Sequence, residues 1–436
     1  MKIQEHLDKI SWSFADKSLF FIYGLVSLFQ MRALTTSEWG LFGLMITLHT
    51  WIYIVIDSFA LQGLIQFGMS EENKNKVNSM ALLTQIIMAL LASIVVYLFR
   101  FELAKILNED GFIKIGYTLP ILILLAIPRT FIIKIVYRCL DYKNLFLIDM
   151  SFFGTMIVLT MYYIIQFGTL SFDNMLIIYF TGAGLSSFFA IILKRKELNF
   201  DFKGDIKYSK IIQFTFPWTV YSAVNYLPKT LDLYIVQYFF KTDATGVYYS
   251  AKNLFRVFDE VLNAAFGLVY PSAVKQIENK NLNALNDLMT KAVSFLLLAF
   301  IFIIAILELG LSEFVIKAFL PATYHGAIGQ FNLLLLAAVG MPFLMLFSII
   351  TALGKPQVAL YSAIISVIIS SATLVIIAYL GRTDLIPFGL ITYVFINAIL
   401  ALFYMRKNYN FQLRSILRAF PDTAFYIKNF ILKKRK

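Results

Sequence analysis

The chain has 436 residues, of which 59% are apolar and only 15% are charged, and its formal net charge is +12. Soluble domains are typically about half apolar and about a quarter charged, so this composition excludes a soluble enzyme, a secreted disulfide scaffold, a coiled coil and a disordered chain. A spanning helix needs about 20 mostly apolar residues, and the composition therefore predicts a polytopic membrane protein. The positive charge favours contact with anionic lipids over binding of nucleic acid.

The apolar segments predict an all-α protein with about twelve transmembrane helices in two parallel six-helix lobes. The spans expected in the first lobe are 14–33, 41–66, 79–99, 115–137, 145–167 and 174–193. Those expected in the second lobe are 211–239, 246–271, 288–309, 328–352, 357–380 and 385–405. Runs such as 121–127 and 296–306 do not alternate apolar and polar residues, so helices are favoured over a β-barrel.

Three domains follow from this division. Residues 1–200 form the expected N-terminal lobe, and residues 201–405 form the C-terminal lobe. Residues 406–436 form a basic tail with two amphipathic pieces, which we expect to lie on the anionic inner leaflet. The longest outside loop, near 310–327, has room only for a surface helix.

Lysine and arginine are distributed unevenly between the loops. With the N-terminus placed inside, the inside segments carry 26 of these residues and the outside loops carry 7. Positive residues gather on the cytoplasmic side of membrane proteins, so we expect both termini in the cytoplasm and the protein in a bacterial inner membrane. We expect no cleavable signal peptide, because no small-residue cleavage site follows the first apolar segment.

An internal repeat joins the two lobes. The tetrapeptide Glu-Asn-Lys-Asn occurs at residues 72–75 and again at 278–281, an offset of 206 positions. The same offset pairs Gly40 with Gly246, each just before the second span of its lobe. The repeat predicts two lobes in parallel orientation about an axis along the membrane normal, with a substrate site between them near the midplane.

Ionisable residues inside the spans are costly and usually face a cavity or a partner. The candidate cleft cations, which we expect to bind substrate, are Arg129, Lys229, Lys252 and Arg256. The candidate cavity acids, which we expect to tune the cavity or bind a coupling cation, are Asp57, Asp232, Asp259 and Glu260. The alternative is a set of structural ion pairs, such as Lys229 with Asp232 one turn apart. Residues near span ends, Asp16, Lys17 and Asp149, are interpreted as interfacial.

Several functional motifs are missing from the sequence. There is no Gly-rich Lys-Ser/Thr phosphate loop, no Gly-x-Ser-x-Gly, no His-Glu-x-x-His and no cysteine cluster. The single cysteine, Cys139, cannot form an internal disulfide. We therefore expect a secondary-type transporter rather than an enzyme, with no metal and no cofactor. Its energy would come from an H⁺ or Na⁺ gradient, a second substrate or metabolism of the substrate.

Three motifs carry a resemblance to a known family. They are the run Arg-Ala-Leu-Thr-Thr-Ser-Glu-Trp-Gly-Leu-Phe at 32–42, the run Gly-Val-Tyr-Tyr-Ser-Ala at 246–251 followed by Pro271, and Ala-Leu-Gly-Lys-Pro at 352–356. In this order and with these spans, the chain resembles the Wzx-type O-antigen flippases. These belong to the multidrug/oligosaccharidyl-lipid/polysaccharide (MOP) exporter superfamily. The resemblance covers nearly the whole chain.

This resemblance implies a function in lipopolysaccharide and surface polysaccharide biosynthesis. A polyprenyl (undecaprenyl) diphosphate-linked oligosaccharide would cross the membrane by alternating access, with the four cleft cations attracting its diphosphate and sugar acids. A polysaccharide polymerase and a chain-length regulator are the implied protein partners. Neutralising Arg256 or Lys252 is expected to abolish transport while the protein stays folded.

Three other functions stay open. A drug or metabolite exporter of the same superfamily, driven by Na⁺ or H⁺, would favour acids and aromatic residues over a cationic cleft. A polysaccharide polymerase or ligase would need a large outside loop with reactive side chains. A scramblase or scaffold would not maintain an asymmetric distribution of substrate between the leaflets.

Overall fold

The computed structural model describes residues 3–409, 411–412 and 416. Within this part of the chain the secondary structure is helical and contains no strand, which confirms the all-α prediction. The contacts divide the chain into two compact units. Unit 1 comprises Met1–Tyr226 with Lys241–Gly246, and unit 2 comprises Leu227–Phe240 with Val247–Lys436. The predicted lobe boundary between residues 200 and 201 lies in the polar loop between the sixth and seventh expected spans, and it stays a prediction.

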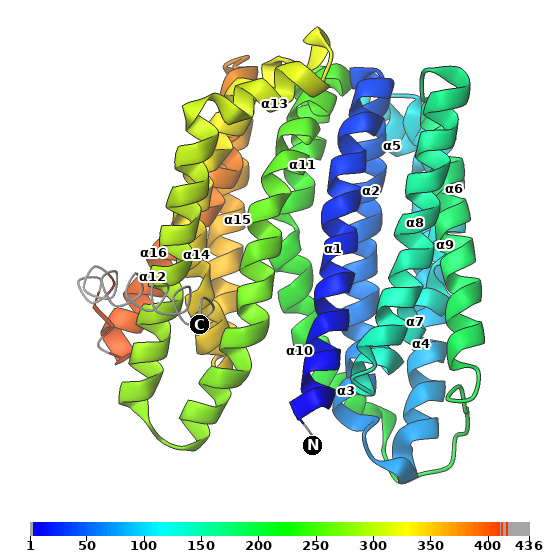
Figure 1. The fold of residues 1–436 in the computed structure, drawn as a ribbon, viewed down its shortest axis with the longest axis vertical. Helices are drawn as coiled ribbons and strands as arrows, with labels where there is room; N and C mark the ends of the chain where they lie inside the picture. Colours follow the sequence, from blue (N-terminus) through cyan, green and yellow to red (C-terminus); the bar gives the residue numbers. More distant parts are fainter. Residues whose placement is uncertain (1–2, 410, 413–415, 417–436) are drawn as a thin grey trace. The chain divides into compact units, whose positions relative to one another are not determined.

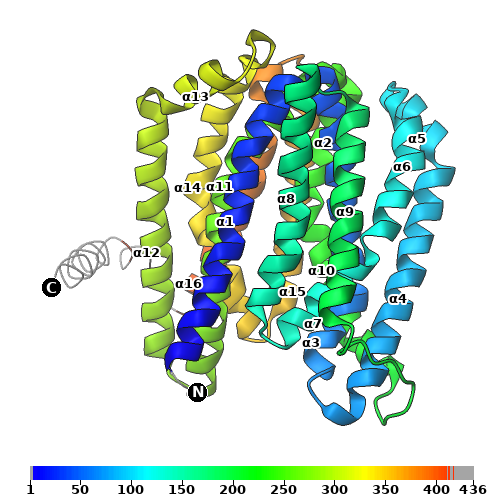
Figure 2. The same cartoon turned by 45° about the vertical axis from the view of Figure 1, so that its right-hand side comes forward.

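Unit 1 is a bundle in which neighbouring helices run side by side (Figures 1 and 2). Its helices are α1 (Ile3–Ala33), α2 (Thr36–Ile56), the π-helix η1 (Asp57–Leu61), α3 (Gln62–Phe67), α4 (Glu71–Leu98), α5 (Arg100–Leu107), α6 (Gly111–Leu125), α7 (Ile127–Arg138), α8 (Tyr142–Phe167), α9 (Phe172–Lys194) and α10 (Tyr208–Tyr226). Helix α8 packs against both α1 and α9, and α4 packs against α6. Helix α10 packs against α2 and η1, so its contacts lie within unit 1.

Unit 2 is built around one long, bent helix and four further long helices. They are α11 (Pro228–Glu278), α12 (Leu282–Ile306), α14 (Gly326–Ala352), α15 (Pro356–Tyr379) and α16 (Phe388–Tyr409). The shorter elements are η2 (Leu307–Leu311), α13 (Ser312–Phe319), η3 (Ala322–Tyr324) and η4 (Thr383–Leu385). Helix α13 lies across one end of this unit (Figure 1), as the expected surface helix.

Helix α11 changes direction at Lys241, whose φ of 70° and ψ of 177° are not helical. We call residues 228–240 the first arm of α11 and residues 247–278 its second arm. Pro228 begins the first arm, because proline has no amide hydrogen to donate and fits the first turn of a helix. The short segment 241–246 between the arms packs with unit 1.

Nine helical segments among the described residues are long and apolar enough to cross a membrane. The three other expected spans correspond to α1, to α10 with the first arm of α11, and to the second arm. Charged residues interrupt the apolar character of these three segments. Large apolar side chains are exposed along α4, such as Leu83, Leu91 and Leu98 at 50–60%, and lipid is the solvent that suits such a surface. The protein is a multi-pass membrane protein.

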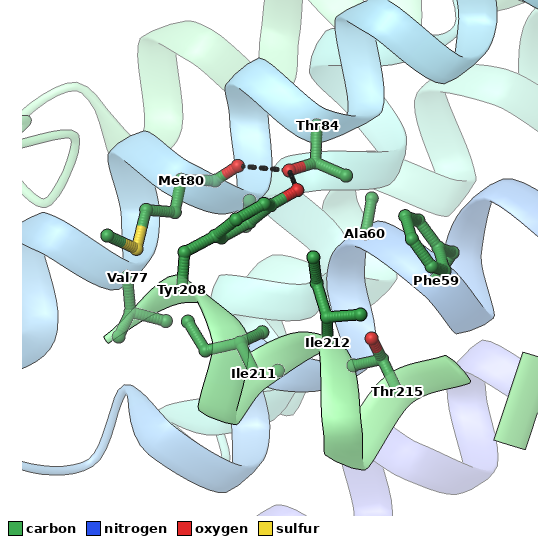
Figure 3. Close-up of a pocket in the computed structure, with 11 residues that line it drawn as sticks. Phe59, Ala60, Val77, Met80, Thr84, Tyr208, Ile211, Ile212 and Thr215 are labelled. Carbon is green, nitrogen blue, oxygen red and sulfur yellow. Dashed lines mark hydrogen bonds between the residues drawn. The ribbon is translucent and has the colours of Figure 1, made fainter. Parts of the chain in front are cut away.

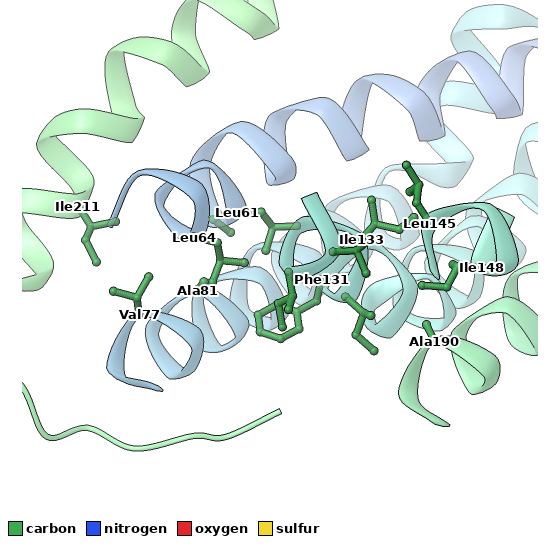
Figure 4. Close-up of a cluster of buried hydrophobic side chains, with 14 residues drawn as sticks. Leu61, Leu64, Val77, Ala81, Phe131, Ile133, Leu145, Ile148, Ala190 and Ile211 are labelled. Carbon is green, nitrogen blue, oxygen red and sulfur yellow. The ribbon is translucent and has the colours of Figure 1, made fainter. Parts of the chain in front are cut away.

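Unit 1 contains a buried apolar cluster (Figure 4). It includes Leu61 and Leu64 from η1 and α3, Phe131 from α7, Ile148 from α8 and Ile211 from α10. Leu61, Leu64 and Ile148 are 0% exposed. Because the segment with Leu61 and Leu64 packs against residues of α7, α8 and α10, the cluster fixes the position of η1 and of the charged residue at its start, Asp57.

Candidate functional site

Two ion pairs join the arms of α11 in unit 2. Nζ of Lys229, in the first arm, lies 2.6 Å from Oδ1 of Asp259 in the second arm. Nζ of Lys252, in the second arm, lies 2.8 Å from Oδ1 of Asp232 in the first arm. The sequence predicted these four residues as a polar set and suggested Lys229 and Asp232 as a pair. The structure brings them together as two pairs that cross from one arm to the other.

The pair of Lys252 and Asp232 is buried, with side chains 13% and 6% exposed. The hydroxyl of Tyr248 donates to Oδ2 of Asp232 at 2.9 Å, and the backbone amide of Leu233 donates to Oδ1 at 2.7 Å. Lys252 Nζ also donates to the backbone carbonyl of Lys229 at 2.8 Å. Removing one partner from a buried pair costs about 3–5 kcal/mol, so this pair holds the two arms together.

The other predicted charges of unit 2 are more exposed. The side chains of Lys229 and Asp259 are 37% and 25% exposed. Arg256 Nε lies 3.3 Å from Glu260 Oε1 one turn along the second arm, and these side chains are 58% and 43% exposed. Exposed ion pairs contribute only about 0–1 kcal/mol. These two pairs are therefore held less firmly than the buried pair of Asp232 and Lys252.

In unit 1, Arg129 forms a buried ion pair with Asp149. Arg129 Nη2 contacts Oδ1 of Asp149, and the two side chains are 17% and 6% exposed. The guanidinium carbon lies 4.5 Å from the centre of the Phe152 ring, a cation–π contact. Arg129 is therefore held by its neighbours in the same way as Lys252, and its predicted role in binding substrate would require this pair to open.

Asp16 and Asp149, which the sequence analysis interprets as interfacial, are only 1% and 4% exposed, so both are buried within the protein. Both lie near the ends of their expected spans, but α1 and α8 pack side by side, so the two carboxylates face protein rather than water. The side chain of Lys17, by contrast, is 58% exposed. Lys17 Nζ lies 3.4 Å from Oδ2 of Asp16.

Asp57 has a partner, Lys134, that the sequence analysis did not single out. Lys134 Nζ lies 2.9 Å from Oδ2 of Asp57, and both side chains are 14% exposed. The hydroxyl of Tyr53 donates to Asp57 Oδ1 at 3.4 Å. Asp57 opens the π-helix η1, and π-helical turns are frequent at functional sites. Lys134 was not among the predicted site residues because it lies near the end of its expected span. Helical spacing could not predict its pairing with Asp57, because the two residues belong to different helices.

Small pockets occur within each unit. The one in Figure 3 lies between η1, α4 and α10, and its empty volume is about 260 Å³. Its lining is apolar apart from Thr84, Tyr208 and Thr215, and the Thr84 and Tyr208 hydroxyl oxygens lie 2.7 Å apart. A second pocket, of about 240 Å³, includes Asp232 and Ser370. The lining of the pocket in Figure 3 contains no charged side chain that could pair with a phosphate.

Four polar groups meet at the connection between α7 and α8 and the end of α9. Lys194 Nζ lies 2.6 Å from Asp141 Oδ2 and 2.8 Å from Glu197 Oε1. Burial alone would raise the pKa of Asp141, but hydrogen bonds from Lys194 and Asn144 hold that pKa below its usual value. Cys139 Sγ lies 3.5 Å from Glu197 Oε2. Burial, and then this carboxylate, raise the pKa of the Cys139 thiol.

Among the described residues, no group of three or more His, Cys, Asp or Glu side chains is arranged to hold a metal ion. The expected amphipathic pieces of the tail lie almost wholly outside the described residues. The structure thus offers two kinds of charged group: buried pairs at Arg129, Asp57 and Lys252, and exposed pairs at Lys229 and Arg256. Their roles in binding substrate or a coupling ion stay predictions.

Comparison with known families gives one match. Residues 31–329 match the model of a family described as polysaccharide biosynthesis protein. No curated protein matches the chain.

Solved structures share the fold over nearly the whole chain. A multidrug resistance MATE family transporter of the MOP superfamily, in an inward-facing conformation, superposes with a TM-score of 0.72 and 13% identity, covering 91% of this chain and 98% of that one. The lipid II flippase MurJ, in an inward closed conformation, has a TM-score of 0.70 and 17% identity, covering 97% and 93%. A MOP superfamily transporter from Pyrococcus furiosus has a TM-score of 0.63 and 13% identity, covering 92% and 94%. The chain therefore shares the fold of these membrane transporters.

Proposed function

The chain belongs to the polysaccharide biosynthesis protein family, and we propose that it is a flippase for a lipid-linked oligosaccharide. The substrate is a polyprenyl (undecaprenyl) diphosphate that carries one repeat unit of O-antigen or a related surface polysaccharide. It moves from the inner to the outer leaflet of the cytoplasmic membrane by alternating access. The match of the polysaccharide family over residues 31–329 is the observation that carries this proposal.

The fold supports the same proposal. MurJ, a lipid II flippase, shares the fold over 97% of this chain, so the fold is compatible with movement of a lipid-linked sugar. The exposed cations Lys229 and Arg256 suit a phosphate group, because ammonium and guanidinium groups donate charge-assisted hydrogen bonds to phosphate oxygens. Both termini would lie in the cytoplasm, and a polymerase and a chain-length regulator would act on the product.

The alternative is a cation-coupled exporter of drugs or metabolites. The shared fold of the MATE multidrug transporter favours it, and so do the carboxylates of Asp259 and Glu260, which suit a cationic drug. The polysaccharide family match favours the flippase. Sensitivity of a deletion strain to cationic drugs would distinguish the two functions.

The direct test is extraction of lipids from a strain that lacks this gene, with its surface polysaccharide assayed in parallel. A flippase predicts loss of the surface polysaccharide and accumulation of unpolymerised polyprenyl-diphosphate oligosaccharide, whose mass gives the sugar composition. Complementation with the native gene should restore both. Normal polysaccharide without accumulation, in a strain that has no second flippase gene, would contradict the proposal.

A further inference from the structure

A further pocket of unit 1 lies between α2, α4 and the junction of α6 with α7, and its empty volume is about 290 Å³. We call it the His49 pocket. Its polar lining residues are His49 and Tyr53 of α2, Gln85 of α4 and Thr130 of α7, and the rest of its lining is aliphatic. His49 and Tyr53 are partly exposed, so a small group can reach the pocket.

The side chain of Gln85 has a defined orientation and one unsatisfied atom. Its Nε2 donates to Thr130 Oγ1 at 2.6 Å and to the Ile127 carbonyl oxygen at 3.5 Å. The Thr130 hydroxyl uses its own hydrogen for the backbone carbonyls of Ala126 and Ile127, both 3.0 Å away, so only a donor can face it. Gln85 Oε1 has no hydrogen-bond partner in the described part of the chain, although Gln85 is only 3% exposed.

His49 is a second polar side chain of the pocket with unused hydrogen-bonding capacity. Among the described residues, no hydrogen bond reaches either nitrogen of its ring. A neutral imidazole has one N–H group to donate and one nitrogen to accept. His49 and Gln85 lie within the apolar spans Thr36–Phe67 and Glu72–Leu98, where an unsatisfied polar group is costly. A group that accepts from His49 and donates to Gln85 would satisfy both.

The charges around the pocket favour a neutral ligand. Its lining has no carboxylate, ammonium or guanidinium group. The charged residues next to the lining in the sequence are paired already: Asp57 lies 2.9 Å from Lys134, and Arg129 contacts Asp149. A carboxylate ligand has no hydrogen to donate to the Gln85 oxygen, and an ammonium group cannot accept a hydrogen bond.

An acetamido group has the complementary chemistry. Its N–H would donate to Gln85 Oε1, and its carbonyl oxygen would accept from the His49 ring. Its methyl group would contact the aliphatic part of the lining, which includes Ile52, Ala89 and Ile123. A hydroxyl group can also form hydrogen bonds here, but it has no methyl group to bury against these side chains.

We propose that the His49 pocket binds the acetamido group of an N-acetylated sugar in the transported oligosaccharide. This inference rests on the proposed function, because it assigns one part of that substrate to a pocket of unit 1. Binding uses hydrogen bonds and apolar contact, and no covalent bond changes. Gln85 and His49 then select an oligosaccharide with an N-acetylated sugar over one with a hydroxyl group in its place.

The first test is saturation-transfer-difference NMR on the purified full-length protein in nanodiscs, with two small glycosides as probes. Methyl N-acetylglucosaminide carries the acetamido group, and methyl glucoside has a hydroxyl group in its place. Neither probe carries a phosphate or a lipid. For the native protein, we expect the acetyl methyl protons to receive the strongest saturation. We expect a Kd about fourfold higher for methyl glucoside, which lacks the buried methyl group.

Three variants assign the signal to the pocket. Gln85→Met keeps the size of the side chain and removes the acceptor, and His49→Phe removes the donor. Each should weaken binding of methyl N-acetylglucosaminide about fivefold, which is the usual effect of one hydrogen bond. Ala89→Leu fills part of the pocket without changing a polar group, and it should abolish saturation of the acetyl methyl protons.

Two control variants lie outside the pocket. Thr84→Val removes a buried hydroxyl next to Gln85 on α4, where Thr84 lines the pocket of Figure 3 instead. Asp287→Asn removes the acid of an exposed pair with Lys291, which is 2.7 Å away on α12 in unit 2. Both variants should bind the two glycosides as the native protein does.

The second test is sugar analysis of the lipid-linked oligosaccharide that accumulates in a strain without this gene. The inference requires that this oligosaccharide contains at least one N-acetylated sugar. Mass spectrometry before and after chemical removal of acetyl groups from nitrogen would detect it. This readout is independent of the purified protein and of its variants.

The outcomes separate this inference from the proposed function. No saturation above that of empty nanodiscs, or equal saturation in the native protein, Gln85→Met and Ala89→Leu, would mean that the pocket holds water only. That result would overturn the inference and leave the flippase proposal standing, and so would an accumulated oligosaccharide without an N-acetylated sugar. Absence of any accumulated oligosaccharide, in a strain that has no second flippase gene, would contradict the flippase proposal and this inference together.

Discussion

The backbones of Gly40 and Gly246 lie in direct contact. A β-carbon built on Gly40 would lie 2.8 Å from the amide nitrogen of Gly246, and one built on Gly246 would lie 3.1 Å from the amide nitrogen of Gly40. The contact is supported by the Thr36 hydroxyl, which donates to Asp243 Oδ1 at 2.6 Å. The two glycines are the residues that the sequence repeat relates by an offset of 206 positions, and only glycine allows such an approach of two backbones.

Substitution of Gly246 by alanine should destabilise the protein. The new β-carbon would overlap the carbonyl oxygen of Thr36. The other two nearest atoms, the carbonyl carbon of Thr36 and the amide nitrogen of Gly40, are also backbone atoms, which cannot rotate away as a side chain can. Overpacking of this kind typically costs about 1–3 kcal/mol. Chemical denaturation in detergent micelles would measure the change in the free energy of unfolding.

Gly154→Ala is the matched control, since its β-carbon would have no atom within 4 Å. Gly154 lies inside α8, where alanine is favoured over glycine by about 0.5–1 kcal/mol. We therefore expect this variant to be as stable as the native protein or slightly more stable. Equal stability of Gly246→Ala and Gly154→Ala would show that the close contact is not rigid.

Lys252 should contribute mainly to folding stability, and Lys229 mainly to transport. Lys252→Met leaves Asp232 buried without a cation, so we expect a loss of about 3–5 kcal/mol in stability. Lys229→Met removes an exposed pair and should change stability by at most about 1 kcal/mol, yet it should reduce complementation of a deletion strain. Denaturation and surface-polysaccharide assays on the same two variants check this division. Two variants with the same loss of stability would refute it.

Arg129 should behave as a structural cation. In Arg129→Met, the buried carboxylate of Asp149 has no opposite charge, and we expect a loss of about 3–5 kcal/mol in the free energy of unfolding. The double variant with Asp149→Asn removes the stranded charge and should recover part of the loss. A double-mutant cycle measures the coupling between the two sites. Purely additive effects would argue against the ion pair.

Cys139 should react slowly with alkylating agents at neutral pH. Since burial and the Glu197 carboxylate raise its pKa, less thiolate is present than for an ordinary cysteine, and the thiolate is the reactive form. The rate should increase as the pH rises, and Glu197→Gln should increase the rate at a fixed pH near 7.5. Labelling with a membrane-impermeant maleimide should occur only from the cytoplasmic side. Labelling of intact cells would contradict the expected orientation.

The spans were predictable from the sequence because a bilayer requires long apolar runs, and such runs are visible without any tertiary information. Three spans contain charges that lower their apolar character, but their apolar runs are still visible in the sequence. The helix α5 was not predicted: its sequence begins with Arg100, which the structure places over the rings of Tyr97 and Phe101 at 3.9 and 4.3 Å.

The ion pairs were only partly predictable. Helical spacing identified the charged faces of the α11 arms, because residues three and four apart share a face. It could not identify partners from the two arms of α11 or from different helices: Lys229 and Asp259 are 30 positions apart, and Arg129 and Asp149 are 20 apart. The burial of Asp16 and Asp149 could not be predicted for the same reason, because these side chains are enclosed only when α1 and α8 pack together.

The most direct test of the central proposal is transport in proteoliposomes. The lipid-linked oligosaccharide that accumulates in the deletion strain is incorporated with the purified full-length protein, and a membrane-impermeant oxidant reports the fraction of sugar on the outer face over time. We predict that the native protein and Asp287→Asn move the oligosaccharide between leaflets, whereas Lys229→Met does not. No movement above that of protein-free liposomes with the native protein would contradict the flippase function.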